Sequence, residues 1–223
     1  MECAVIVFVH GAGRHGRDAW PSMEIADAVF ADFSSERSVG RQADSLIELV
    51  TGPTIVVAHS HGAIPVLLAL PLIRRQVKAL VLLEPALYDV ARGDPSVEAH
   101  ISAMEHAREV LAAEGLESFW RVVRPRMFAG PLRSEEWEHE RARAARFAEI
   151  VPPWGHGIEA STIEGTETHV ISGGWNDEYE AIAAALSRHG ALHQMFAGSH
   201  HRPQDDPRFA TALRTVRASH AGG

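Results

Sequence analysis

The sequence of 223 residues contains a single cysteine, Cys3. One cysteine cannot form an intramolecular disulfide, and it excludes a metal centre built from several thiolates. A chain that makes so little use of cysteine suits a reducing compartment. We therefore expect a cytoplasmic protein that is held together by its core alone.

Long hydrophobic runs are also missing. The apolar segment 4–9 near the start is too short for the core of a signal peptide or for a membrane span, and the opening Met-Glu-Cys carries no cationic residue. We expect neither a secretion signal nor a membrane anchor.

Positive charge is scarce. The sequence has 21 lysines and arginines against 29 acidic residues, and Lys78 is the only lysine. The net charge of -8 provides no basic field for nucleic acid or for an anionic membrane surface. The hydrophobic share of 46% is that of an ordinary folded domain. The expected partner is a small-molecule substrate, and no feature of the sequence indicates an oligomeric state.

Three compact apolar runs rich in β-branched residues are present at 4–9, 54–58 and 77–83. Such runs are typical of parallel strands that are buried on both faces. Between the second and third runs, Gly62 to Ile73 has the length and apolar spacing of a crossover helix. This strand-helix-strand unit predicts an α/β fold: a mostly parallel sheet with helices on both faces.

The middle of the chain has a different pattern. Residues 96–113 and 134–150 are amphipathic helices by their spacing, with no strong strand between them, which predicts a helical lid at 93–151 inserted into a core formed by 1–92 and 152–223. After the lid we expect alternating elements again: strand 168–172, helix 178–188, strand 191–196 and a last helix from about 207 to 218.

Ser60 lies at a sharp junction between the strand at 54–58 and the helix that starts at Gly62. This is the context of a nucleophile elbow, which needs small residues two positions on either side of the serine; Ala58 and Gly62 provide them. The serine hydroxyl would project above the sheet, and the N–H of His61 would point to where an oxyanion forms.

The first strand ends in His10-Gly11-Ala12-Gly13, and loops rich in glycine and histidine follow the late strands. With these motifs and the elbow, the chain resembles the α/β-hydrolase superfamily, in particular its lid-bearing, esterase-like serine hydrolases. The resemblance implies that the amide of Ala12 completes the oxyanion hole with that of His61, with Gly13 as the nearby alternative.

Two departures from this family's pattern concern the start of the chain. The first expected strand already carries the oxyanion loop, so the usual leading hairpin is missing. The connection from Trp20 to Ser45 is short, and residues 28–33 are the only candidate for the intervening strand.

In this superfamily the triad follows the order serine, acid, histidine, and Ser60, Asp177 and His201 occur in that order. Asp177 lies in a glycine-opened loop after a strand, so it is the expected acid; Glu84 is the rival, because some members place the acid after the strand that follows the nucleophile helix. His201 lies in a loop that resembles the family's late Gly-His-x-Pro motif and is the expected base. Its neighbour His200 is the alternative.

Other functions compete with this interpretation. Gly11, Gly13 and Gly16 follow a strand and Asp32 ends another apolar run, which is the pattern of an NAD(P)-binding Rossmann-type oxidoreductase. Against it, the charged segment 14–18 is a poor start for a packed helix. A hydrolase-like ligand-binding protein without catalysis is the third possibility.

The favoured hypothesis is a serine hydrolase that cleaves an ester, thioester or amide through an acyl-enzyme on Ser60, with no cofactor and no metal. Aromatic side chains of the lid region suggest a small, apolar substrate. They are Phe119, Trp120, Phe128, Trp137, Phe147 and Trp154.

Overall fold

The computed structural model describes residues 4–23, 25, 28–128 and 130–220, so Cys3 lies outside the described residues. The chain divides into two compact units. One comprises Met1–Arg92 and Pro153–Gly223, and the other comprises Gly93–Pro152.

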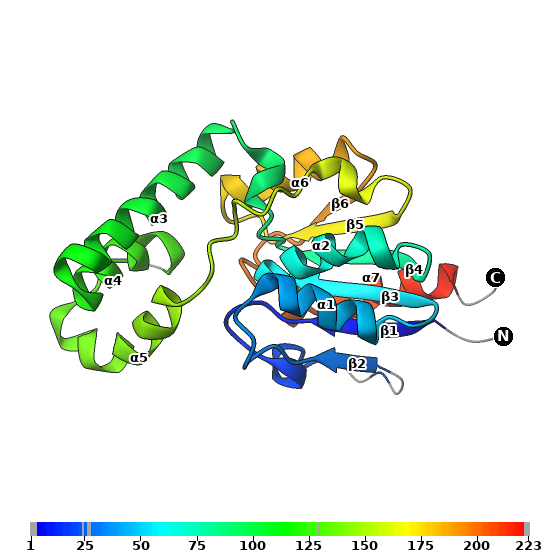
Figure 1. Ribbon diagram of the computed structural model, residues 1–223, viewed down its shortest axis with the longest axis horizontal. Coiled ribbons are helices and arrows are strands. Elements are labelled where there is room, and N and C mark those ends of the chain that lie inside the picture. Colours follow the sequence, from blue (N-terminus) through cyan, green and yellow to red (C-terminus); the bar gives the residue numbers. More distant parts are fainter. Residues whose placement is uncertain (1–3, 24, 26–27, 129, 221–223) are drawn as a thin grey trace. The chain divides into compact units, whose positions relative to one another are not determined.

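The larger unit contains a six-stranded, entirely parallel and open sheet in the order β2-β1-β3-β4-β5-β6 (Figure 1). The bounds are β1 (Val5–Val9), β2 (Ala28–Ala31), β3 (Thr54–His59), β4 (Val77–Leu83), β5 (Glu167–Ser172) and β6 (Leu192–Met195). The expected fold class is therefore confirmed.

The register brings the functional loops together. Val9 pairs with Ala58, His59 with Leu83, and Leu83 with Ile171, so β1, β3, β4 and β5 end at the same edge of the sheet. Since the strands are parallel, the loops that follow all of them leave from this edge.

Helices cover both faces of the sheet: α1 (Val39–Leu49) and α2 (Ala63–Ile73) lie in front of it in Figure 1 and α7 (Pro207–Ser219) behind it, while α6 (Asp177–Ser187) connects β5 to β6. Phe209 and Leu213 of α7 share one core cluster with Phe8 of β1 and Val57 of β3. This packing buries the apolar stripe of α7 and fixes the back of the sheet.

Helix α1 was not expected from the sequence. Its buried residues Val39, Ala43 and Leu46 recur at helical spacing, but they are few and the rest of the helix is polar. Ser38 caps its N-terminus by accepting a hydrogen bond from the Arg41 N–H. So narrow an apolar stripe gives only a weak helical pattern in the short connection between β2 and β3.

The smaller unit consists of α3 (Pro95–Glu114), α4 (Leu116–Met127) and α5 (Trp137–Ala148). Gly115, at φ 91°, ends α3 and allows α4 to begin in a new direction. Trp120 is completely buried and donates its indole N–H to Glu140, 2.5 Å away. Phe119 is buried as well, so both aromatic residues belong to the core of the helical unit.

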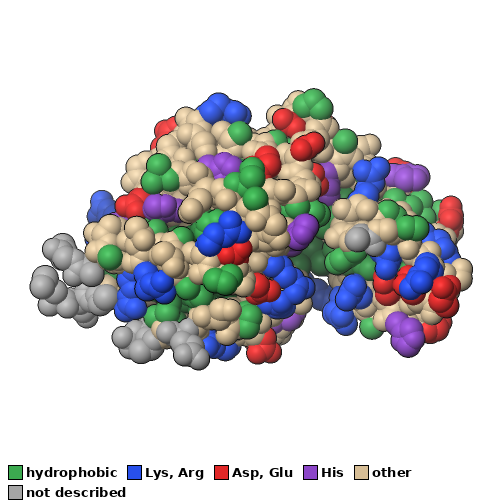
Figure 2. Space-filling model, turned by 180° about the vertical axis from the view of Figure 1, so that it is seen from behind, with side chains coloured by type: hydrophobic (Ala, Val, Ile, Leu, Met, Phe, Trp, Pro, Cys, Tyr) green, Lys and Arg blue, Asp and Glu red, His purple; other side chains and the backbone are tan. Residues whose placement is uncertain are grey.

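None of the described helices is long and apolar enough to cross a membrane. On the face drawn in Figure 2, acidic and basic side chains of the described residues are interspersed.

Candidate active site

Ser60 follows β3 directly and begins the short 3-10 turn Ser60–Gly62 that leads into α2. Its φ of 51° lies in the left-handed region, which a non-glycine residue seldom adopts. A Cβ on Gly62 would lie 2.4 Å from the backbone oxygen of His10, so only glycine fits there. The turn therefore has the strained backbone and the close approach of a nucleophile elbow.

His201 lies in the loop after β6, and its ring joins two other polar groups. Its Nε2 is 3.0 Å from Ser60 Oγ, and its Nδ1 is 3.3 Å from Glu84 Oε2. His200 is exposed, with φ 50°. Of the two neighbouring histidines, the structure brings His201 to the serine.

Glu84, directly after β4, is completely buried. Its Oε1 accepts the N–H of Gly173 at 2.5 Å, and its Oε2 accepts the indole N–H of Trp175 at 2.6 Å. With His201, three N–H groups surround the carboxylate. A buried carboxylate needs such donors, because unpaired burial of the charge would be very unfavourable.

Asp177, the expected acid, is exposed at the first position of α6, behind the N-cap Asn176. Both ring nitrogens of His201 have other partners, so the structure does not bring Asp177 into the site as the orienting acid. Of the two carboxylates considered from the sequence, the structure brings Glu84, and not Asp177, to His201. The loop before Asp177 contributes hydrogen-bond donors through Gly173 and Trp175, while its aspartate is a helix N-terminal charge that the helix dipole favours.

Backbone strain is concentrated at this site. Among the described residues, the non-glycine residues with positive φ are Ser60, Glu84 and His200, at 51°, 44° and 50°. Ser60 and Glu84 directly follow β3 and β4, and His200 lies in the loop after β6. Strain of this kind persists only where the surrounding structure enforces it, and it clusters at functional sites.

Burial shifts the ionisation of the two titrating partners. It raises the pKa of Glu84 to about 7, against the opposing effect of the hydrogen bonds from Trp175 and Gly173. Enclosure of its ring lowers the pKa of His201 to about 4. His201 is therefore neutral at physiological pH, and its Nε2 lone pair is available to the Ser60 hydroxyl once Nδ1 carries the proton.

His59, the residue before Ser60, contacts the backbone of His201. Its Nε2 lies 2.9 Å from the backbone oxygen of His201, and because a carbonyl only accepts, Nε2 carries the hydrogen. Burial, together with the nearby His201, lowers the pKa of His59 to about 3. His59 is thus a neutral donor that anchors the loop of His201.

The loop after β1 packs against the elbow. A Cβ on Gly11 would lie 3.0 Å from the Cβ of Ser60, which shows how closely this loop approaches the serine. His10 stabilises it: Nδ1 is 2.7 Å from the Gly11 oxygen, and Nε2 accepts the N–H of Phe33 at 2.8 Å. Ala12 lies at the exposed tip of this loop, where the family resemblance places an oxyanion donor.

A bidentate ion pair links the loop after β1 to the segment after His201. Arg14 Nη1 and Nη2 donate to the two carboxylate oxygens of Asp205 at 2.9 and 2.8 Å. Paired hydrogen bonds of this type fix orientation as well as distance. The two loops that flank Ser60 are therefore held together.

The glycine pattern of the alternative oxidoreductase does not form a dinucleotide site. Among the described residues between β1 and β2, the helical structure is the 3-10 turn Gly16–Ala19, too short to provide the helix N-terminus that pyrophosphate needs. Asp32 accepts the N–H of Ser34. This part of the chain is a structural loop.

His10, His15 and Asp32 have side-chain ligand atoms within 4.8 Å of one another, the spacing of a possible metal site. Both ring nitrogens of His10 are already engaged, however, by the Gly11 oxygen and the Phe33 N–H. A metal ion would have to displace one of these bonds. The donor set does not fit a metal without that rearrangement.

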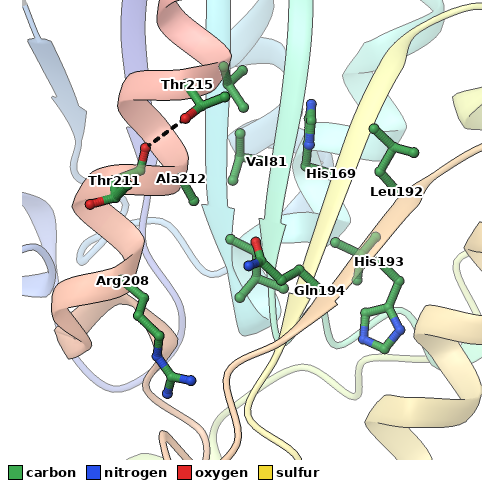
Figure 3. Close-up of a pocket in the computed structure, with 12 residues that line it drawn as sticks. Val81, His169, Leu192, His193, Gln194, Arg208, Thr211, Ala212 and Thr215 are labelled. Carbon is green, nitrogen blue, oxygen red and sulfur yellow. Dashed lines mark hydrogen bonds between the residues drawn. The ribbon is translucent and has the colours of Figure 1, made fainter.

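A cavity of about 440 Å³ lies between α7 and the strands β5 and β6, away from Ser60 (Figure 3). Apolar and polar residues of the strands, the polar ones being His169, His193 and Gln194, line it together with Arg208, Thr211 and Thr215 of α7. Thr215 Oγ1 donates to the Thr211 oxygen at 3.2 Å, and Arg208 pairs with Asp206. The cavity contains no member of the Ser60 cluster.

Comparison with known proteins agrees with the fold. A family described as the alpha/beta hydrolase family matches residues 6–213. No curated protein sequence matches the chain.

Several solved structures share the fold at low sequence identity. MenH from S. aureus has a TM-score of 0.66 and 14% identity, over 99% of this chain and 95% of that one. A hydrolase from Oleispira antarctica has a TM-score of 0.65 and 11% identity, over 97% and 92%. A thermophilic esterase from Thermogutta terrifontis has a TM-score of 0.58 and 18% identity, over 97% and 90%.

Proposed function

Because this chain belongs to the alpha/beta hydrolase family, we propose that it is a serine hydrolase that cleaves an ester, thioester or amide through an acyl-enzyme on Ser60. One observation carries the proposal: His201 lies between Ser60 and Glu84, at 3.0 Å from the hydroxyl and 3.3 Å from the carboxylate. A nucleophile, a base and a group that orients the base, in hydrogen-bond order, define this chemistry.

In the proposed first step, Ser60 Oγ attacks the substrate carbonyl carbon while its proton passes to His201 Nε2. Glu84 stabilises the imidazolium and holds Nδ1–H in place. His201 then gives the proton to the leaving group. The acyl group remains on Ser60 until a water molecule, deprotonated by His201, attacks it. The C–Oγ bond then breaks, Oγ leaves with the electron pair, and His201 returns the proton to it.

The proposed oxyanion hole consists of the backbone N–H groups of Ala12 and His61. The approach of Gly11 to Ser60 and the position of His61 in the turn after the nucleophile support this assignment. Two preorganised donors would stabilise the negative charge that develops on the carbonyl oxygen.

We propose that the substrate is small and apolar around its carbonyl group. Aromatic rings of the larger unit support this: Trp175 and Tyr179 lie against His201 at 5.8 and 5.1 Å between ring centroids, and Tyr88 contacts Trp154 at 6.0 Å. The single cysteine supports a cytoplasmic setting.

A panel of p-nitrophenyl esters with acyl chains of increasing length tests the reaction class. We expect hydrolysis with saturation kinetics. Esters with short, apolar acyl chains should be hydrolysed faster than an ester with a charged acyl group, and Ser60→Ala should show no turnover. Failure to hydrolyse any activated ester or thioester, combined with stoichiometric NAD(P)H binding in a fluorescence titration, would contradict the proposal.

A further inference from the structure

Trp175 contacts both the acid and the base of the proposed triad. Its indole N–H donates to Glu84 Oε2 at 2.6 Å, and its ring lies 5.8 Å from that of His201 between centroids, with the two ring planes at 64°. The residue is half-buried in the loop between β5 and α6. The mechanism described so far gives this side chain no part.

The carboxylate of Glu84 is held at both of its oxygens. Oε2 is shared between the indole N–H of Trp175 at 2.6 Å and Nδ1 of His201 at 3.3 Å. Oε1 accepts the N–H of Gly173 at 2.5 Å. Because donors on different oxygens prevent the carboxylate from rotating, Trp175 and Gly173 together fix the position of the oxygen that receives Nδ1–H.

The indole also favours the charged form of the acid. An indole N–H can only donate, and a carboxylate is a stronger acceptor than a neutral carboxylic acid. Glu84 is completely buried, and burial raises its pKa to about 7, against the opposing hydrogen bonds from Trp175 and then Gly173. Without the indole donor, the buried carboxyl group would be mostly protonated at neutral pH.

Ionisable groups of the surrounding elements act on Glu84 less strongly than the indole does. Glu178 raises the pKa of Glu84 and His193 lowers it, each by less than the Trp175 hydrogen bond. Burial raises the pKa values of both neighbouring tyrosines, so these stay neutral. The groups that face Glu84 are His201 in the loop after β6, His193 of β6, Glu178 and Tyr179 of α6, and Tyr88 of the 3-10 turn Tyr88–Ala91.

We propose that Trp175 is a positioning residue, whose indole N–H keeps Glu84 ionised and directs its Oε2 toward Nδ1 of His201. This inference rests on the proposed function. The indole keeps its own proton throughout, while the serine proton passes to His201 and back. The loop in which the sequence predicts the acid Asp177 would thus hold an acid that follows β4.

The pH dependence of Trp175→Phe tests the inference. The measurements are the second-order rate at which a fluorophosphonate probe phosphonylates Ser60 and kcat/KM for an activated ester, both as functions of pH. Loss of the donor disfavours the ionised carboxylate, so the rise in activity with pH, centred near 7 in the wild type, should move up by about one pH unit or more. The rate should then be about 10-fold lower at pH 6 and nearly equal to that of the wild type at pH 9.

Two further variants separate the hydrogen bond from packing. Placing 3-benzothienylalanine at position 175 keeps the shape of tryptophan but replaces its N–H by sulfur, and should shift the pH dependence as Trp175→Phe does. Trp20 is completely buried, and its Nε1 has no hydrogen-bond partner among the described residues. Trp20→Phe should therefore lower Tm and leave the midpoint of the pH dependence unchanged. Circular dichroism establishes that each variant is folded.

Nuclear magnetic resonance observes the hydrogen bond without catalysis. In protein labelled with ¹⁵N, the resonance of the Trp175 indole N–H, identified by its loss in Trp175→Phe, should shift with pH around a midpoint near 7 in the wild type and should not do so in Glu84→Gln.

The possible outcomes separate the two proposals. If folded Trp175→Phe or the 3-benzothienylalanine variant has the midpoint of the wild type, or loses the same factor in rate at every pH, the positioning role is wrong and the serine hydrolase remains. If the folded wild-type protein does not react with the probe at any pH, the proposed function itself fails, and the positioning role fails with it even where the indole resonance titrates.

Discussion

Replacing Glu84 by glutamine is expected to lower kcat/KM by about 10³–10⁴-fold, whereas Asp177→Asn is expected to leave it within about 2-fold. The two variants make the same chemical change, from a carboxylate to an amide, at the two candidate acids. Only Glu84 is hydrogen-bonded to His201. The contrast therefore identifies which carboxylate orients the base.

The size of the Glu84 effect follows from its three donors. Glutamine has one acceptor oxygen, but Glu84 accepts from Gly173 on one oxygen and from Trp175 and His201 on the other. If the amide NH2 faces His201, the imidazole must adopt the other tautomer, and its Nε2–H then cannot take the serine proton. If the NH2 faces Gly173, two donors meet at 2.5 Å.

The Glu84–His201 pair also determines how activity depends on pH. The active free enzyme needs ionised Glu84 and neutral His201, and burial raises the pKa of Glu84 to about 7 while that of His201 is lowered to about 4. Activity of the wild type is thus expected to rise with pH through about 7, as the pair loses its shared proton. In Glu84→Gln the residual activity should no longer rise with pH through about 7, so it should be independent of this ionisation above about pH 5. A wild-type limb near pH 4 would contradict an acid with a raised pKa.

Asp177→Asn has its own readout. The exposed carboxylate lies in the first turn of α6, so its removal weakens a favourable interaction with the helix dipole by about 0.3–1 kcal/mol. A small decrease in Tm with unchanged kinetics is expected. A loss of activity in Asp177→Asn as large as that in Glu84→Gln would overturn the assignment of Glu84.

The second large effect is expected for Gly173→Ala. An added Cβ would lie 1.7 Å from the backbone oxygen of His200 and 2.5 Å from its carbonyl carbon, and backbone atoms cannot yield as a flexible side chain does. The loop of His201 must therefore move. A displacement of about 1 Å at the base costs about 100-fold in rate, so kcat should fall by at least that factor.

Stability should fall in the same variant, because overpacking costs about 1–3 kcal/mol. For a chain of this size each kcal/mol corresponds to a decrease in Tm of about 2–4 °C. The matched control is Gly52→Ala, where an added Cβ meets nothing within 4 Å and φ is not in the left-handed range. Calorimetry and ester kinetics on both variants check the prediction; equal behaviour of the two would refute the close contact at Gly173.

Much of the fold could be predicted from the sequence, because the apolar runs of its central strands are typical of buried parallel strands. The strand β4 (Val77–Leu83) has the predicted bounds, and β3 and β5 differ from the prediction by one residue at one end. These strands are apolar because helices cover both faces of the sheet, and the sequence pattern that predicts them is therefore strong. The helix α4 (Leu116–Met127) was missed, since its charged residues and Pro125 obscure the period of its buried positions.

The site could be predicted only where local chain geometry defines it. The elbow at Ser60 is a local turn, and the small residues around it reveal it. Which carboxylate contacts His201 depends on long-range packing, because several loops meet at one edge of the sheet. The sequence alone does not tell which of these loops brings its carboxylate to the histidine. An ionisable residue directly after the apolar strand 77–83 was the signal for Glu84; nothing in the sequence indicated Trp175, Tyr179 or the His59 contact.

Ser60 as the activated nucleophile is the central claim, and covalent labelling tests it most directly. The folded protein is treated with a fluorophosphonate, and the adduct is located by intact mass and peptide mapping. We predict one adduct per chain on Ser60 in the wild type, none in Ser60→Ala, and a much slower reaction in His201→Ala. An unlabelled wild type, or an adduct on another residue that persists in Ser60→Ala, would contradict the claim.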